Sequence, residues 1–179
     1  MRVLIIGGGA SGMIAALTAA ENPEHRVILL ERQSRVGRKL AATGNGRCNL
    51  TNLNANLSNY HGDAPEFILP AFQGFDVSAT LDWFQSHGLL TVAEDSGKVY
   101  PFSDQAGSVV DVLRLALAQH TNITLDTGTE VSNLYFRDDA FFAETAERRY
   151  AADCVIVACG GLAGSKLGGT NSGYQLLKS

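Results

Sequence analysis

The amino-acid sequence predicts an α/β fold of three layers that is built on a parallel sheet. Residues 3–6 are an uninterrupted apolar run that ends in glycines, which is typical of a parallel strand buried on both faces. Residues 11–21 follow with the composition of a helix, and Pro23 cannot continue it. Residues 26–30 form a second apolar run. Strand, helix and strand in so short a stretch predict a parallel pair joined by a right-handed crossover.

The elements expected after this unit are mixed in type. Residues 34–59 are rich in Gly, Asn, Arg and Thr without periodicity, and such long irregular segments are usually functional or disordered. The other expected elements are short helices at 66–73 and 77–87, a β-hairpin that turns at 95–97, a helix at 108–120, a strand at 122–127, a β-meander at 131–150 with a turn at Asp138–Asp139, and a buried strand in 154–161. No repeat or Pro/Ser-rich linker interrupts the chain, so we expect one domain over residues 1–179.

Composition limits the class of protein. The 179 residues are 45% hydrophobic, with a net charge of −4. These values are those of an ordinary globular chain and argue against a basic surface for nucleic acid or anionic lipid. No apolar run is long enough to cross a membrane and no signal-peptide pattern is present, so we expect a cytoplasmic protein. The three cysteines and four histidines form no metal-binding pattern, so we expect reduced thiols and no metal site.

The first glycine motif, GGGASG, lies where the first strand ends and the helix begins. Gly7 permits a tight turn, Gly9 lets the backbone approach a pyrophosphate, and Gly12 allows the helix to pack against the strand. The phosphates then meet the N–H groups and the positive dipole at the helix N-terminus. Glu31 ends the second strand, where a carboxylate accepts hydrogen bonds from ribose hydroxyls and disfavours a 2′-phosphate. The motif predicts a dinucleotide with a free ribose 2′-OH; the alternative is a glycine-rich turn beside a surface carboxylate.

The loop after Glu31 bears on the choice between NAD and FAD. A simple NAD-binding domain continues into another regular strand and helix, whereas residues 36–52 read VGRKLAATGNGRCNLTN. The cations of this loop and Arg35 can meet the outer side of a pyrophosphate. Gly44 and Gly46 can let the backbone lie against a flat ring. This pattern favours FAD.

At these residues the chain resembles the YhiN/BaiN-like family of NAD(P)/FAD-dependent oxidoreductases, the aminoacetone-oxidase-like flavoproteins. The N-terminal pattern of that family is similar to GGGxSG, then E, then GRKxxxSGNGRCNxTN. The stretches GKVYP at 97–101 and VIVACGGLAGS from residue 155 are similar to two further family segments. Cys159 stands where the family more often has Thr, and Asn171–Ser172 where it more often has Gly–Asp. The resemblance implies a Rossmann-like FAD-binding domain of the glutathione-reductase superclass, with a parallel sheet and a β-meander.

The resemblance also implies which residues bind the cofactor. Ala10, Ser11 and Gly12 face the pyrophosphate, the backbone of Val131 contacts adenine, and the Gly44–Asn49 loop approaches the isoalloxazine. The full set of expected cofactor-binding residues is Gly7, Gly9, Ala10, Ser11, Gly12, Glu31, Arg32, Arg38, Lys39, Gly44, Asn45, Gly46, Arg47, Cys48, Asn49, Val131, Ala158, Gly160 and Gly161. No residue has the spacing of a general acid or base, so no catalytic residue is assigned.

The expected function is FAD-dependent redox chemistry, in which a hydride passes between the flavin and a small organic substrate or NAD(P)H. Two alternatives remain, an NAD-binding dehydrogenase domain and a non-catalytic flavin-binding or interaction module. Members of the family resemble a longer chain, with a substrate-facing insertion and a C-terminal segment that closes the flavin site. We therefore expect these residues to be the N-terminal portion of such a protein, with the missing C-terminal part as a partner.

Overall fold

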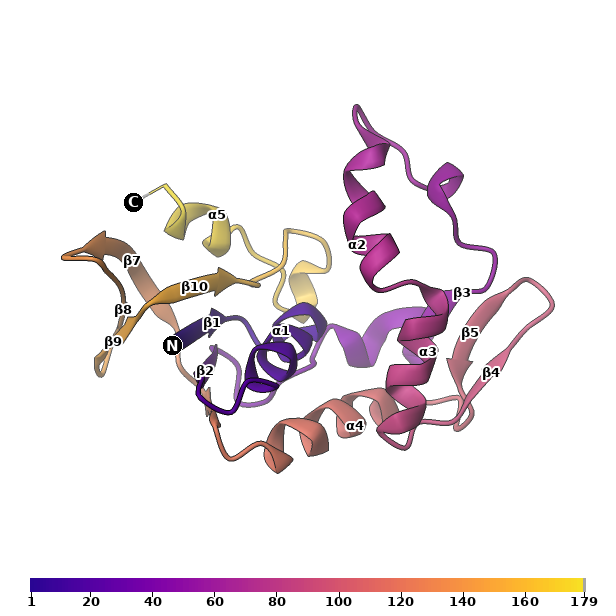
Figure 1. The fold of residues 1–179 in the computed structure, drawn as a ribbon, viewed down its shortest axis with the longest axis horizontal. Helices are drawn as coiled ribbons and strands as arrows, with labels where there is room; N and C mark the ends of the chain where they lie inside the picture. The colour runs from indigo at the N-terminus through magenta and orange to yellow at the C-terminus, as the bar shows by residue number, and fades with distance from the viewer. Residues whose placement is uncertain (179) are drawn as a thin grey trace. The chain divides into compact units, whose positions relative to one another are not determined.

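The computed structural model describes residues 1–178 and is drawn in Figure 1. The chain forms two compact units. The first consists of Met1–Leu40 and Leu113–Ser179, and the second of Ala41–Val112. The first unit contains a four-stranded and a three-stranded sheet, and the second unit a three-stranded sheet. The expectation of one domain over residues 1–179 stays a prediction.

A parallel sheet forms the centre of the first unit. Its strands follow the order β10-β1-β2-β6, with the bounds β1 Arg2–Ile6, β2 Arg26–Glu31, β6 Ile123–Thr127 and β10 Cys154–Val157. Every pair is parallel, and Ile5 lies opposite Leu29 on one side and Ile156 on the other. The carboxyl ends of all strands therefore lie at the same end of the sheet, which is where open α/β sheets bind their ligands.

Helix α1, Ala10–Ala20, joins β1 to β2 and packs against both strands. Its buried residues are spaced by three and four positions, as on one helical face: Gly12, Met13, Ala16, Leu17 and Ala20. Most of them are small, so the helix lies close to the sheet. The side-chain amide of Asn122 donates to the carbonyl of Ala20 at 3.0 Å and satisfies one acceptor at the end of the helix.

The two faces of β1 and β2 pack against different layers. Leu4, Ile6 and Leu30 belong to a buried cluster that the β-meander completes. Ile5 and Leu29 alternate with these residues, point to the face on which α1 packs, and are fully buried. Helix, sheet and meander are thus three layers, which confirms the predicted fold class.

The meander consists of β7 Val131–Arg137, β8 Ala140–Thr145 and β9 Arg149–Ala152, which pair as antiparallel neighbours. Asp138 and Asp139 have φ of 51° and 58°, so both central residues of the first turn are left-handed. Two such residues make the hairpin turn whose twist matches the flanking strands. The turn predicted at this pair is confirmed, and β9 extends beyond the expected end at residue 150.

The second unit contains a small antiparallel sheet of order β3-β5-β4. Its elements are β3 Thr51–Asn52, α2 Leu69–Gly74, α3 Val77–Ser86, β4 Thr91–Ala93 and β5 Lys98–Pro101, with 3-10 turns at Leu57–Asn59 and Pro65–Ile68. The segment Leu40–Gly46, which has a kink at Thr43–Asn45, begins in the first unit and leads into the second. The hairpin predicted around 95–97 is confirmed. The helix predicted at 66–73 is split into a 3-10 turn and α2, and Pro70 lies in the first turn of α2, where its missing N–H costs nothing.

The remaining helices complete the chain. Helix α4, Ala106–Gln119, crosses the boundary between the two units. After β10 come a 3-10 turn, Ser165–Leu167, and a short helix α5, Ser172–Leu176. Over residues 1–178, no helix is both long enough and apolar enough to cross a membrane.

The contact between α1 and the first turn predicts that Gly12 tolerates no side chain. A Cβ at Gly12 would lie 1.8 Å from the carbonyl oxygen of Gly7, so Gly12→Ala should destabilise the protein by about 3 kcal/mol. Gly107, in α4, is the matched control, because none of residues 1–178 has an atom within 4 Å of its added Cβ, apart from the local neighbours. Gly107→Ala should stabilise the chain by about 0.5 kcal/mol. Urea unfolding followed by circular dichroism measures both, and equal stability of the two variants would contradict the packing role of Gly12.

Candidate functional site

The first glycine turn lies between the ends of two other strands. Gly7 has φ of 112°, a value that favours glycine, and its N–H donates to the carbonyl of Leu30 at 2.8 Å. An added Cβ at Gly7 would lie 2.5 Å from the carbonyl oxygen of Ala158, just after β10. One at Gly8 would lie 2.6 Å from Val36 Cγ1. Both glycines are therefore required by packing within the protein.

Gly9 is different, because its missing side chain leaves room on the outside of the turn. No atom of residues 1–178 beyond its immediate neighbours lies within 4 Å of a Cβ built there. Gly9 is the N-cap of α1 in extended conformation, and Ala10–Ala20 has neither an acidic first turn nor a side-chain cap within the described chain. Ala10 and Ser11 are exposed. The first N–H groups of α1 thus face solvent at the positive end of the helix dipole, which is an arrangement suited to an anion.

Glu31 is held beside this turn by two backbone hydrogen bonds. Its Oε2 accepts from the N–H of Gly8 and its Oε1 from the N–H of Gln33, both at 2.7 Å. A carboxylate has about four acceptor positions, so two remain for other donors such as ribose hydroxyls. The sequence predicted the ribose role, but it did not predict that the same carboxylate fixes the glycine turn.

The segment after β10 supplies a second glycine turn in the same unit. Ala158 N–H donates to the carbonyl of Ile6 at 2.8 Å, and Gly160 has φ of 72°. A Cβ at Gly160 would lie 2.9 Å from Lys39 Nζ, which places this ammonium beside the turn. At Gly161, as at Gly9, an added Cβ meets no atom of residues 1–178 within 4 Å beyond the adjacent residues.

The other predicted residues of this unit lie around the end of β2. Arg38 is exposed and donates to Gln33 Oε1 at 3.0 Å and to the carbonyl of Lys166 at 3.4 Å. Val131 is buried where β7 begins, next to a register shift in its pairing with β8. Arg32 contacts Glu130, the residue before Val131. These placements leave the predicted phosphate and adenine contacts as predictions.

The predicted loop Gly44–Asn49 belongs to the second unit and has an unusual backbone. Gly44, Asn45, Gly46 and Cys48 have φ of 55°, 57°, 85° and 62°. An added Cβ at Gly44 would lie 2.7 Å from Asn49 N, so the turn is closed tightly on itself. Left-handed conformation is unfavourable for Asn and more so for Cys, and such positions persist where the surroundings require them. This loop lies in the second unit and the glycine turns lie in the first. The predicted contact of the loop with the flavin stays a prediction.

Arg47 of this loop has partners within its own unit. Its guanidinium donates to Asp104 and to Glu94, the latter at 2.9 Å, and lies 3.9 Å from the centre of the Tyr100 ring. The hydrogen bonds to the Asp104 and Glu94 carboxylates raise the pKa of Arg47. Two carboxylates thus balance its charge, a pairing that its position in the sequence did not reveal, and the predicted phosphate contact of Arg47 stays untested.

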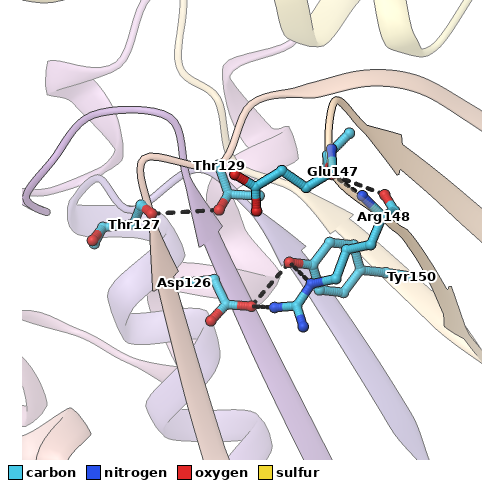
Figure 2. Close-up of polar contacts among 7 residues, drawn as sticks. Asp126, Thr127, Thr129, Glu147, Arg148 and Tyr150 are labelled. Carbon is cyan, nitrogen blue, oxygen red and sulfur yellow. Dashed lines mark hydrogen bonds and ion pairs between the residues drawn. The ribbon is translucent and has the colours of Figure 1, made fainter.

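A polar cavity of about 480 Å³ lies between the turn after β6 and the turn before β9. Figure 2 shows its polar contacts: Asp126 Oδ2 accepts from Arg148 Nη2 at 2.5 Å and from the Tyr150 hydroxyl at 2.9 Å. Arg148 Nε donates to the same hydroxyl at 2.8 Å. Arg148 is an exposed charge in the turn before β9, and its contact with Asp126 links this turn to β6. Only the fold brings these two segments together.

The thiols of Cys48 and Cys159 are held in their protonated form. Burial raises the pKa of Cys48, and burial together with the negative charge of Glu31 raises the pKa of Cys159. A protonated thiol is a weak nucleophile. Within residues 1–178, no group of three or more His, Cys, Asp or Glu side chains is placed to hold a metal ion.

The fold and the glycine turn define a class of protein: an α/β protein of the Rossmann type, in which a glycine turn joins the first parallel strand to the first helix. Residues 1–179 match the HI0933-like protein Rossmann domain, and the chain belongs to that family.

Two relatives and one solved structure indicate the range of similar proteins. The chain is 43% identical over 179 residues to the 3-dehydro-bile acid delta(4,6)-reductase of Clostridium scindens, an alignment that covers 99% of this chain and 43% of that protein. It is 28% identical over 173 residues to the ribosomal RNA dihydrouridine synthase of Escherichia coli, covering 97% and 42%. The open conformation of a flavocytochrome c3 fumarate reductase has a similar fold, with a TM-score of 0.59 and 19% identity over 90% of this chain and 34% of that chain. The chain thus spans less than half the length of the curated relatives that it matches.

The two backbone contacts of Glu31 predict a loss of stability in Glu31→Gln. An amide has only one acceptor oxygen, so its NH₂ group must face the N–H of either Gly8 or Gln33. The unsatisfied donor should cost about 1 to 2 kcal/mol in the free energy of unfolding. Glu24→Gln is the control, because Glu24 is exposed in the turn between α1 and β2. Urea unfolding without any ligand compares the variants, and equal midpoints would show that the two hydrogen bonds contribute nothing.

The raised pKa values predict slow alkylation of Cys48 and Cys159. Their rates with iodoacetamide should be below that of a free thiol at pH 8 and should still climb above pH 9, because the folded protein disfavours the thiolate. Glu31→Gln removes the negative charge beside Cys159 and should raise its rate, while Cys48 keeps its rate. Mass spectrometry of each labelled cysteine measures this. A uniform change at both sites would indicate loosened packing instead of a charge effect.

Proposed function

We propose that the chain is the FAD-binding part of a flavoprotein oxidoreductase. The observation that carries the proposal is the open N-terminus of α1, with room at Gly9 and the Glu31 carboxylate beside the turn. An anionic group fits at the first N–H groups of the helix, and a ribose fits at the free acceptor positions of Glu31. A dinucleotide carries both groups.

The residues that would hold FAD follow from this arrangement. Gly9, Ala10, Ser11 and Gly12 would bind the diphosphate and Glu31 the adenosine ribose. The backbone of Val131 would contact adenine. In the second unit, the Gly44–Asn49 loop would approach the isoalloxazine. When bound, FAD would supply two-electron redox chemistry, and the protein would supply orientation and electrostatics.

The family and the two relatives support a reductase but leave its substrate open. The relative at 43% identity is named as a reductase of a bile acid, a small molecule, and the one at 28% as a synthase that acts on ribosomal RNA. The greater similarity and the net charge of −4 favour a small organic substrate for the whole protein, with NAD(P)H as reductant. The second candidate is action on RNA, which the name of the second relative supports. Reduction of a dienone bile acid or of uridine in RNA by the loaded protein separates the two.

Substitution at Gly9 tests cofactor binding more cleanly than substitution at Glu31, which also has a structural role. Gly9→Val should abolish FAD binding, because the side chain would occupy the space of the diphosphate, while circular dichroism should show an unchanged fold. Gly107→Val is the matched control, since an added Cβ there also meets no other part of residues 1–178.

The absorption spectrum of the purified protein and titration with FAD and NAD give the result. Yellow protein, or tight binding of added FAD that Gly9→Val abolishes, supports the proposal. Binding of NAD alone would make the chain an NAD-binding dehydrogenase domain. Bound flavin that no electron donor reduces would make it a non-catalytic flavin-binding module.

A further inference from the structure

Arg32 joins two segments that follow different strands. It comes directly after β2, and its Nη2 donates to the carbonyl of Gly168 at 2.6 Å. Its Nη1 lies 3.6 Å from Glu130 Oε1, and the Arg32 side chain is only 30% exposed. Gly168 belongs to the loop after β10, and Glu130 to the turn between β6 and β7. One guanidinium thus connects the segments that follow the two outer strands of the parallel sheet.

The turn on one side is already fixed to β2 by its backbone. Gly128 N–H donates to the carbonyl of Gln33 at 2.8 Å, and Thr129 N–H donates to the carbonyl of Glu31 at 2.9 Å. Glu130 is the next residue, and its contact with Arg32 continues this row of attachments toward Val131. The position of the Val131 backbone therefore depends on the end of β2.

The loop after β10 is packed tightly on itself, and it contacts the segment that follows β2 through side chains of that segment. A Cβ at Gly169 would lie 2.5 Å from the carbonyl oxygen of Ala163, so the loop is closely packed on itself. Arg32 donates to its Gly168 carbonyl at 2.6 Å, and Arg38 to its Lys166 carbonyl at 3.4 Å. The shorter of these two bonds is that of Arg32, the better buried of the two cations.

We propose that Arg32 is a positioning residue for the adenosine half of a bound dinucleotide. It holds the loop after β10 and the turn before Val131 at fixed positions on either side of the end of β2, where Glu31 lies. An arginine suits this role because its planar fork can bind a carbonyl and a carboxylate at once, whereas a lysine offers one compact charge. The inference rests on the proposed function and gives Arg32, which the resemblance implied only as a cofactor-binding residue, a positioning role for the adenosine part of the ligand.

The first experiment compares ligands that carry different halves of FAD. ADP has the adenosine half and riboflavin the flavin half, and each is titrated into wild type, Arg32→Gln and Arg32→Lys by calorimetry. Arg32→Gln should weaken ADP and FAD about fivefold to tenfold and leave riboflavin unchanged. Arg32→Lys should restore part of the loss, because it keeps one of the two contacts. Arg137→Gln is the charge-matched control, since Arg137 is 74% exposed and pairs with its neighbour Asp138.

The second experiment needs no ligand. Hydrogen exchange of the unliganded protein should be faster in Arg32→Gln at both 160–169 and 128–131, and unchanged in the strands of the sheet. A third experiment uses ADP again: in a double-mutant cycle, Arg32→Gln and Glu130→Gln together should weaken ADP binding less than the sum of their separate effects.

The outcomes separate this inference from the proposed function. If wild type binds neither FAD nor ADP, both the proposed function and the role of Arg32 are overturned. If wild type binds them and Arg32→Gln binds ADP equally well, only the role of Arg32 is overturned. Equal losses of ADP and riboflavin, or exchange that rises throughout the chain, would show that Arg32 only supports the fold. Additive effects with Glu130→Gln would overturn the link to the turn.

Discussion

Helix α1 begins so close to the preceding turn that no side chain fits between them. A Cβ on Gly12 would lie 1.8 Å from the Gly7 carbonyl oxygen, and one on Gly7 would meet the backbone of Ala158 at 2.5 Å. This double contact fixes the end of β1, the start of α1 and the end of β10 relative to one another. This packing therefore also sets the direction in which the first N–H groups of α1 point. Gly7 and Gly12 make the close packing contacts of the motif, so the space beside Gly9 remains open.

Most of the first unit could be predicted from the sequence because its signals are local. The apolar run at β1, the glycines, the small residues of α1 and the acid at the end of β2 follow one another within a single strand-helix-strand unit. The hairpin at Asp138–Asp139 was equally predictable, since two residues tolerant of left-handed conformation stand between alternating strands. The space around an added Cβ agrees with the packing roles predicted for Gly7 and Gly12, and the approach of a pyrophosphate at Gly9 stays a prediction.

The sequence could not show the partners of long charged side chains. Arg47 stands in a loop that suggests phosphate binding, yet Glu94 and Asp104 reach it from distant positions. The exposed Arg148 pairs with Asp126 of β6, and nothing in the sequence near Arg148 indicates this partner. A guanidinium has a long reach and five donors, so tertiary contacts decide what it binds. The partners of Glu31 were equally open from the sequence, because a carboxylate near a glycine turn can bind the turn, a ribose or both.

The pairing of β1 with β10 also sets the order in which the protein can assemble. Val3 lies opposite Cys154, and Gly7 packs on Ala158. Strand β1 therefore cannot complete its pairing until residues about 150 positions later in the chain have been made. Contacts between such distant segments form late in folding, because the entropic cost of closing a long loop comes before the contacts can stabilise the protein. On the ribosome, the N-terminal strand, turn and helix emerge first but keep one side of β1 unpaired until β10 arrives. The glycine turn is thus made long before the segment that completes its packing, and a nascent chain cannot have the finished turn before its second glycine segment has left the exit tunnel.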